Sequence, residues 1–110
     1  MEVIATPDFK RCLRRLARRY PLVADTVAEL GRELASGARP TDSRLYSLGG
    51  AQIYKGRLPN RSAARGKSGG FRVYYSVKLG TVHVLWIEAR SKSGVFSDAR
   101  IRAIAQDLYS

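Results

Sequence analysis

One hairpin, residues 71–89, limits the folds open to this chain more than any other stretch. Apolar side chains alternate with polar ones along residues 71–77, which predicts a strand with one face in the core. The following Lys-Leu-Gly-Thr at residues 78–81 is typical of a hairpin turn. Alternation along residues 82–89 puts Val82, Val84 and Trp86 on one face and Leu85, Ile87 and Ala89 on the other. A strand that is apolar on both faces requires a central place in a sheet, at least partly covered on both sides.

The first third of the chain predicts a short strand, Glu2–Ala5, followed by two helices. Thr6-Pro7-Asp8 is a helix start, because Thr can cap the free amides, Pro suits the first helical position and Asp complements the helix dipole. This helix is expected to end near Arg19, and a second one covers residues 22–35. The apolar stripes are Phe9, Leu13, Leu16 and Tyr20 in the first helix and Val23, Val27, Leu30 and Leu34 in the second.

The remaining segments complete an α+β domain. Residues 38–52 are expected to be a loop, residues 53–58 a strand, and residues 59–70 an exposed, mobile, basic and glycine-rich connection. Ser97 is expected to cap a final helix, residues 98–109, that buries Ile101, Ile104 and Leu108. The predicted order is therefore an N-terminal strand, a two-helix hairpin, an antiparallel three-strand meander and a C-terminal helix, in one domain spanning residues 1–110.

The charge of the chain favours a polyanionic partner. There are 20 Lys and Arg against 9 Asp and Glu, a formal net charge of +11. No acidic residue occurs from residue 43 to residue 87, whereas eight basic residues do. The outer face of the first helix adds Lys10, Arg11, Arg14, Arg15, Arg18 and Arg19. That face is either simply solvated or a second surface for a polyanion.

Membrane insertion and secretion are not expected. The longest apolar stretch, residues 82–87, includes His83 and falls far short of the roughly 20 residues that span a bilayer. The N-terminus lacks the basic segment and apolar run of a signal peptide. The single cysteine, Cys12, cannot form an internal disulfide and is expected to be a half-buried helix residue. We expect a cytoplasmic protein.

The basic residues of the two strands are candidates for binding RNA phosphates. Lys55 and Arg57 share one strand face by alternation, and Arg72 lies near the start of the next strand. Arg matches phosphate oxygens with a planar fork, whereas Lys is a movable point charge that can also serve as a base. A 2′-hydroxyl can attack its neighbouring phosphodiester if the protein orients it, neutralises the oxygens and manages the protons. A surface that only binds RNA would have the same residues.

Other site chemistries have little support in the sequence. One histidine cannot make a two-histidine ribonuclease pair, and His83, within an apolar strand, is expected to be structural. The nine acidic residues are scattered, so neither a metal-carboxylate site nor a cofactor is expected. The GKSGG at residues 66–70 joins two strands and precedes no helix, so it is not a phosphate-binding P-loop.

Four segments resemble the RelE/ParE superfamily of type II toxins. They are YKGRL (residues 54–58), GFRVYY (70–75), the apolar strand that ends in Ala89-Arg90, and VFSDARI (95–101). The N-terminal TPDFKRCLRRLARRYP and the GKSGGFRVYY loop are most similar to the RelE/HigB-like branch. The resemblance covers nearly the whole chain, depends on the joint order of these segments, and implies a RelE-like fold.

The resemblance implies an endoribonuclease, an mRNA interferase that enters the ribosomal A site against rRNA and cuts mRNA without a metal. Lys55 would abstract a proton or support charge, Arg57 and Arg72 would contact the scissile phosphate, and Arg90 would stabilise charge or aid the leaving group. The expected RNA-binding residues are Arg61, Arg65, Lys67, Lys92 and Phe96. Phe96 stands where some members carry a tyrosine, so the donor of the leaving-group proton has no assignment; Arg90, Lys92 and Lys67 are the substitutes.

The resemblance also implies a cognate antitoxin protein as a partner. An acidic, partly disordered antitoxin segment could cover the basic face or displace the final helix. Three other readings stay open: a ParE-like toxin that inhibits a topoisomerase by protein contact, a non-catalytic RNA- or ribosome-binding module, and a degenerate or inactive toxin. The cluster of Lys55, Arg57 and Arg72 disfavours the first, because a protein-binding toxin has no need of a phosphate site.

Overall fold

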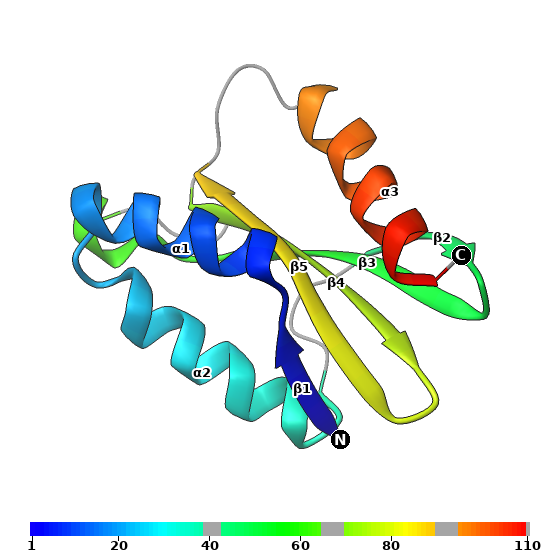
Figure 1. The fold of residues 1–110 in the computed structure, drawn as a ribbon. Coiled ribbons are helices and arrows are strands. Elements are labelled where there is room, and N and C mark those ends of the chain that lie inside the picture. Colours follow the sequence, from blue (N-terminus) through cyan, green and yellow to red (C-terminus); the bar gives the residue numbers. More distant parts are fainter. Residues whose placement is uncertain (39–42, 65–69, 90–94, 110) are drawn as a thin grey trace.

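The computed structural model describes residues 1–38, 43–64, 70–89 and 95–109, where three α-helices pack on a five-stranded sheet (Figure 1). The strand order is β1-β5-β4-β3-β2. β1 runs parallel to β5, and every other neighbouring pair is antiparallel. The strands are β1 (Glu2–Ala5), β2 (Ser43–Leu48), β3 (Ala51–Leu58), β4 (Phe71–Lys78) and β5 (Thr81–Ala89). The predicted α+β class is confirmed, and the apolar β5 has a strand on each side, as predicted.

Strand β2 lies where the sequence predicted a loop. It pairs antiparallel with β3, which begins at Ala51, so the meander has four strands rather than three. The turn between them is Gly49-Gly50, and both glycines have positive φ angles, of 57° and 82°. Such a pair is a strong hairpin signal, because two positive φ angles match the twist of the flanking strands. The β4–β5 turn at Leu79-Gly80 uses the same geometry.

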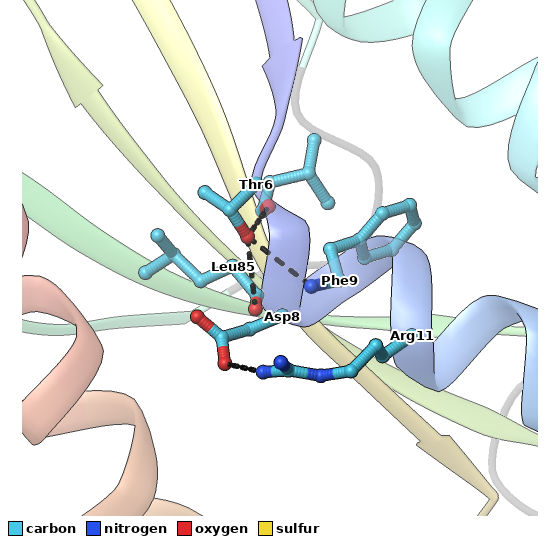
Figure 2. Close-up of polar contacts among 6 residues, drawn as sticks. Thr6, Asp8, Phe9, Arg11 and Leu85 are labelled. Carbon is cyan, nitrogen blue, oxygen red and sulfur yellow. Dashed lines mark hydrogen bonds and ion pairs between the residues drawn. The ribbon is translucent and has the colours of Figure 1, made fainter.

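The start of helix α1 (Pro7–Arg19) is tied to the sheet by Thr6. The Thr6 hydroxyl oxygen accepts a hydrogen bond from the backbone N–H of Phe9 at 3.2 Å. The same hydroxyl donates to the carbonyl oxygen of Val84 at 2.9 Å and lies within 3.4 Å of that of Leu85 (Figure 2). One side chain thus caps the helix and joins it to β5, as the helix-start motif predicted.

Helix α1 and helix α2 (Val23–Ala35) cover one face of the sheet (Figure 1). The predicted apolar stripes of both helices face this core, together with Cys12, which is buried rather than half-buried. The sheet contributes Leu58, Phe71, Val73, Tyr75, Val82, Val84 and Ile87 to the same core. Among the described residues this is the larger of the two apolar clusters. It holds α1 and α2 against this face of the sheet.

A bulge in β5 changes which of its side chains share a face. Tyr74 pairs with Trp86, but Tyr75 pairs with Val84, so Leu85 is an extra residue in the ladder. Leu85 packs on the opposite face, whereas Ile87 returns to the face of Val82 and Val84. The prediction that Leu85 and Ile87 share a face is therefore wrong, because simple alternation does not continue through a bulge.

Helix α3 (Val95–Tyr109) covers the other face of the sheet (Figure 1). Ile101 and Ala105 are its fully buried residues and pack against Ile53, Tyr74 and Leu85. Leu108 is 39% exposed, so its predicted burial is wrong; Ala105 takes that place one turn after Ile101. The helix also begins at Val95, before the predicted cap Ser97.

Candidate functional site

Three of the predicted site residues meet on the face of the sheet that carries α3. On β3, Ala51 and Ile53 pack toward α3, and alternation continues this face to Lys55 and Arg57. On β4, Arg72 is the register partner of Arg57, and Tyr74 is the partner of Lys55. Arg57 is exposed, whereas Lys55 and Arg72 are half-buried. We refer to Lys55, Arg57 and Arg72 as the cationic cluster.

The pairing of Arg57 with Arg72 sets two cations side by side on neighbouring strands. Like charges at directly opposed positions repel and destabilise a sheet. An anion bound between the two guanidinium groups would reverse that effect, since each group can form paired hydrogen bonds with phosphate or carboxylate oxygens. The electrostatics of this end of β3 and β4 therefore favour an anionic ligand.

Tyr74 belongs to this site, although the sequence did not single it out. It is 0% exposed, and its hydroxyl donates to Oδ1 of Asp98 at the start of α3, at 3.4 Å. Burial, with smaller contributions from Glu88 and Asp98, raises the pKa of Tyr74 to about 12, against a weaker opposing effect of Arg72. The phenol therefore stays protonated near neutral pH and acts as a hydrogen-bond donor, not as a base.

Glu88 is a second residue that the sequence did not assign to the site. It is the register partner of Arg72 on β5, so an acidic side chain lies on the other side of this arginine from Arg57. Alternation counted from Val82 puts Glu88 on the opposite face, and only the bulge at Leu85 brings it to the face of the cluster. The sequence pattern does not show where the bulge lies, so it could not have placed Glu88 on this face.

The position of α3 over the sheet is set by polar and cation–π contacts as well as by its apolar side. The guanidinium carbon of Arg102 lies 4.2 Å from the ring centroid of Tyr46, and that of Arg100 lies 5.7 Å from the ring centroid of Trp86. At the C-terminal end, the Tyr109 hydroxyl contacts Oγ of Ser76 and lies 3.2 Å from Nδ1 of His83. His83 thus takes part in holding the helix, in keeping with the expected structural role.

Arg61 is not part of the cationic cluster. It begins the short 3₁₀ helix Arg61–Ala63, and its guanidinium donates to Oε2 of Glu29 on α2 at 3.0 Å. Nearby, the Leu22 backbone N–H donates to Oγ of Ser62 at 2.9 Å, and Asn60 is buried. The first part of the 59–70 segment is therefore held against α2. Residues 61–64 are exposed, as predicted, whereas Asn60 is buried.

Several predicted site residues lie outside the described part of the chain. They are Arg65, Lys67, Arg90 and Lys92. Phe96 lies in the first turn of α3, and its side chain is likewise outside what is described. Their predicted roles stay predictions.

The cavity between α1 and α3 does not coincide with the cationic cluster. It has a volume of about 380 Å³ and is lined by both signs of charge, including Asp8, Asp107 and Arg100, over Trp86 and Cys12. Burial raises the pKa of the Cys12 thiol above its ordinary value, so this cysteine stays a neutral thiol. A cavity of about 220 Å³ at the β3–α2 edge is lined in part by Arg57 and Arg61, with Glu29 and Glu33 beside them.

The described residues contain neither a candidate metal site nor a membrane-spanning helix. No three His, Cys, Asp or Glu side chains in these ranges converge in an arrangement that could hold a metal ion. None of the helices in the same ranges is long and apolar enough to cross a membrane. Comparisons of the chain with protein-family models, curated proteins and solved structures produced no match.

Proposed function

We propose that the protein is the toxin of a type II toxin–antitoxin system, a RelE-like, metal-independent mRNA endonuclease that cuts ribosome-bound message and inhibits translation. The observation that carries this proposal is the placement of Arg57 beside Arg72, next to Lys55, on one face of the sheet. A site for a scissile phosphate needs this convergence of cations. The resemblance of residues 54–58 and 70–75 to RelE-type toxins supports the same residues.

The chemistry would be attack of the RNA 2′-hydroxyl on the adjacent phosphorus, which expels the 5′-oxygen of the next nucleotide. Arg57 and Arg72 would neutralise the non-bridging oxygens, and Lys55 would take the proton from the nucleophile or support charge. Glu88, across the ladder from Arg72, would orient its guanidinium group. Tyr74, a neutral phenol that donates to Asp98, would hold the first turn of α3 at the edge of the site. The leaving-group proton would come from outside the described residues, through Arg90, Lys92 or Lys67.

The proposed partners are mRNA, the ribosomal A site and a cognate antitoxin. An acidic antitoxin segment would cover the cationic cluster or displace α3. Its binding would weaken as salt is added, because ions screen exposed charges. An affinity that salt does not change would indicate apolar docking alone.

The test is the Arg72→Ala variant, compared with wild-type protein and with Arg44→Ala. Arg44 is an exposed arginine on β2 that donates to Oε1 of Gln52, so its removal matches the change in charge away from the cluster. Primer extension in cells after induction should show codon-phased mRNA cuts for the wild type and the control. We expect Arg72→Ala to lower the cleavage rate about 100-fold, the loss typical of removing one group that stabilises transition-state charge.

Three outcomes contradict the proposal, each in a different way. Growth inhibition that survives Arg72→Ala undiminished excludes phosphate chemistry at this site. Inhibition of a topoisomerase with intact mRNA indicates a ParE-like toxin. RNA binding without cleavage by the wild type, with circular dichroism showing a folded protein, indicates a non-catalytic RNA-binding module.

A further inference from the structure

The outer surface of α1 carries a continuous basic face. At about 100° of rotation per residue, six basic side chains fall within about half of the helix circumference, and the buried stripe fills the remainder. All six side chains are exposed. They are Lys10, Arg11, Arg14, Arg15, Arg18 and Arg19, which we call the basic face of α1. From Arg11 to Arg18 this face extends about 10 Å along the helix axis.

Few of these charges are neutralised within the protein. Arg11 forms an ion pair with Asp8 in the first turn (Figure 2), and Arg19 lies over the ring of Tyr20, 5.4 Å from its centroid. Among the described residues, no ion pair or hydrogen bond involves the side chains of Arg14, Arg15 or Arg18. These arginines repel one another at i,i+4 spacing. Arg18 lies in the last turn, where a cation favours the helix dipole, whereas Arg14 and Arg15 lie before that turn and each has a basic neighbour at i,i+4.

The basic face of α1 is separate from the cationic cluster. Helices α1 and α2 cover one face of the sheet, and Lys55, Arg57 and Arg72 lie on the face that carries α3 (Figure 1). A polyanion on α1 therefore does not need to contact the cluster. The two surfaces can be changed independently by mutation.

We propose that the basic face of α1 binds the phosphate backbone of double-stranded RNA. The proposal goes beyond the cleavage site, and it rests on the proposed function in one respect, that RNA is the partner of this protein. Five of the six residues are arginines, whose planar forks fit phosphate oxygens. A rigid helix holds them in a fixed row, which suits a duplex of fixed shape. A-form RNA is recognised mainly through its shape and its backbone.

The composition of the face favours a duplex over other polyanions. Surfaces that bind single strands combine cations with aromatic platforms on which bases stack. Here Tyr20 is half-buried in the core and packs edge-on against Phe71, which leaves no such platform. The buried centre of a protein interface is usually apolar, whereas the exposed residues of α1 besides the six cations are only Pro7 and Ala17. A row of cations with little exposed apolar or aromatic surface between them fits a phosphate backbone best.

The test measures binding of a fluorescent RNA hairpin with about 20 base pairs, by anisotropy, over a range of KCl concentrations. Each lost phosphate contact lowers the slope of log Kd against log salt by about 0.9. We expect the triple variant Arg14→Gln/Arg15→Gln/Arg18→Gln to lower the slope by about 3 and Arg18→Gln alone by about 1. The matched control is Arg32→Gln, an exposed arginine in the last turn of α2, which should leave the slope unchanged.

Three results would overturn the proposal. The first is an equal slope for the wild type and the triple variant, with both proteins folded by circular dichroism. The second is equal competition by an unstructured RNA of the same length, which would remove the duplex preference. The third is equal competition by a polyglutamate peptide of the same charge, which would assign the face to an acidic protein.

This experiment is independent of cleavage. Arg72→Ala protein should bind the hairpin with a slope within about one of the wild-type value, because at most one phosphate contact is lost. If the cleavage proposal fails, the hairpin measurement still decides the role of α1. If the α1 variants bind as the wild type does while Arg72→Ala abolishes cleavage, only the α1 proposal fails.

Discussion

At the scale of single residues, Tyr74 links the cationic cluster to α3. Its ring is buried between β4 and α3, and its hydroxyl reaches Asp98 in the first turn of that helix. The side chains of Arg72 and Glu88 lie close enough to shift its pKa in opposite directions. A substitution at Tyr74 is therefore expected to change both the stability of the protein and the geometry of the site.

The raised pKa of Tyr74 predicts a specific loss of stability at high pH. The folded protein holds the phenol proton up to a pKa of about 12, and the unfolded chain releases it near pH 10. The contribution is thus complete below pH 10 and is lost as the pH rises from 10 to 12. We expect the wild type to lose on the order of 2 kcal/mol more than Tyr74→Phe over this range, measured by urea unfolding. Equal losses in the two proteins would contradict the assignment.

Strict alternation along β5 assigns Glu88 to the wrong face of the sheet. In a regular strand it would share the face of Val82 and Val84, under the helical hairpin. The extra residue Leu85 shifts the remainder of β5 by one position, and Glu88 then faces α3 beside Arg72. The acid-free interval from residue 43 to residue 87 is accurate as a sequence statement, yet the folded site includes a carboxylate.

At the scale of elements, the docking of α3 depends on the turn between β2 and β3. A Cβ atom at Gly49 would lie 2.7 Å from the carbonyl oxygen of Tyr109 and 2.8 Å from its Cβ atom. Tyr109 in turn contacts Ser76 and His83 on the sheet. The β2–β3 turn, which was expected to be part of a loop, is therefore a contact surface for the end of the final helix.

Gly49→Ala should destabilise the protein more than a matched change at Gly80. Both glycines have positive φ angles, of 57° and 80°, so alanine adds backbone strain of about 1 kcal/mol at either position. Only at Gly49 does the new methyl group also meet backbone and side-chain atoms of Tyr109; nothing lies within 4 Å at Gly80. We expect a further loss of about 1–3 kcal/mol for Gly49→Ala in urea unfolding. Equal losses would mean that α3 docks without this close contact.

At the scale of the whole molecule, the net charge of +11 destabilises the folded state, because like charges repel one another in a compact chain. Part of this repulsion lies on α1, where Lys10–Arg14, Arg11–Arg15, Arg14–Arg18 and Arg15–Arg19 are i,i+4 pairs of like charge. At about 0.2–0.5 kcal/mol each, the four pairs cost on the order of 1 kcal/mol. Salt screens such exposed pairs.

Salt should therefore stabilise this protein, and α1 should account for much of the effect. We expect Tm to rise by about 4 °C between roughly 20 mM and 500 mM NaCl, measured by scanning calorimetry. The triple variant Arg14→Gln/Arg15→Gln/Arg18→Gln should have a higher Tm at low salt and a smaller rise. If salt raises the Tm of the wild type and of the triple variant equally, the repulsion that salt screens lies elsewhere in the chain.

The sequence alone was sufficient for the helical hairpin and for most of the α+β order. The Thr6 cap of α1 and the apolar stripes of α1 and α2 are local patterns, and local patterns determine helices whose burial is one-sided. The alternation of residues 71–77 and the turn at residues 78–81 determined the β4–β5 hairpin in the same way. The placement of Lys55 and Arg57 on one face follows from the two-residue period of a strand.

Only the tertiary structure decided the remainder, because it depends on pairing between distant segments. The Gly49-Gly50 pair signals a hairpin turn, but the residues before it were expected to be a loop, and pairing with the edge of β3 makes them strand β2. Arg57 meets Arg72 through the β3–β4 register, and Glu88 joins them through a bulge. Ion pairing with Glu29 ties Arg61 to α2, where it shares a cavity with Arg57 but not with Lys55 or Arg72. Residue types and periods are properties of the chain, whereas register, bulges and ion pairs are chosen by the packing of the whole fold.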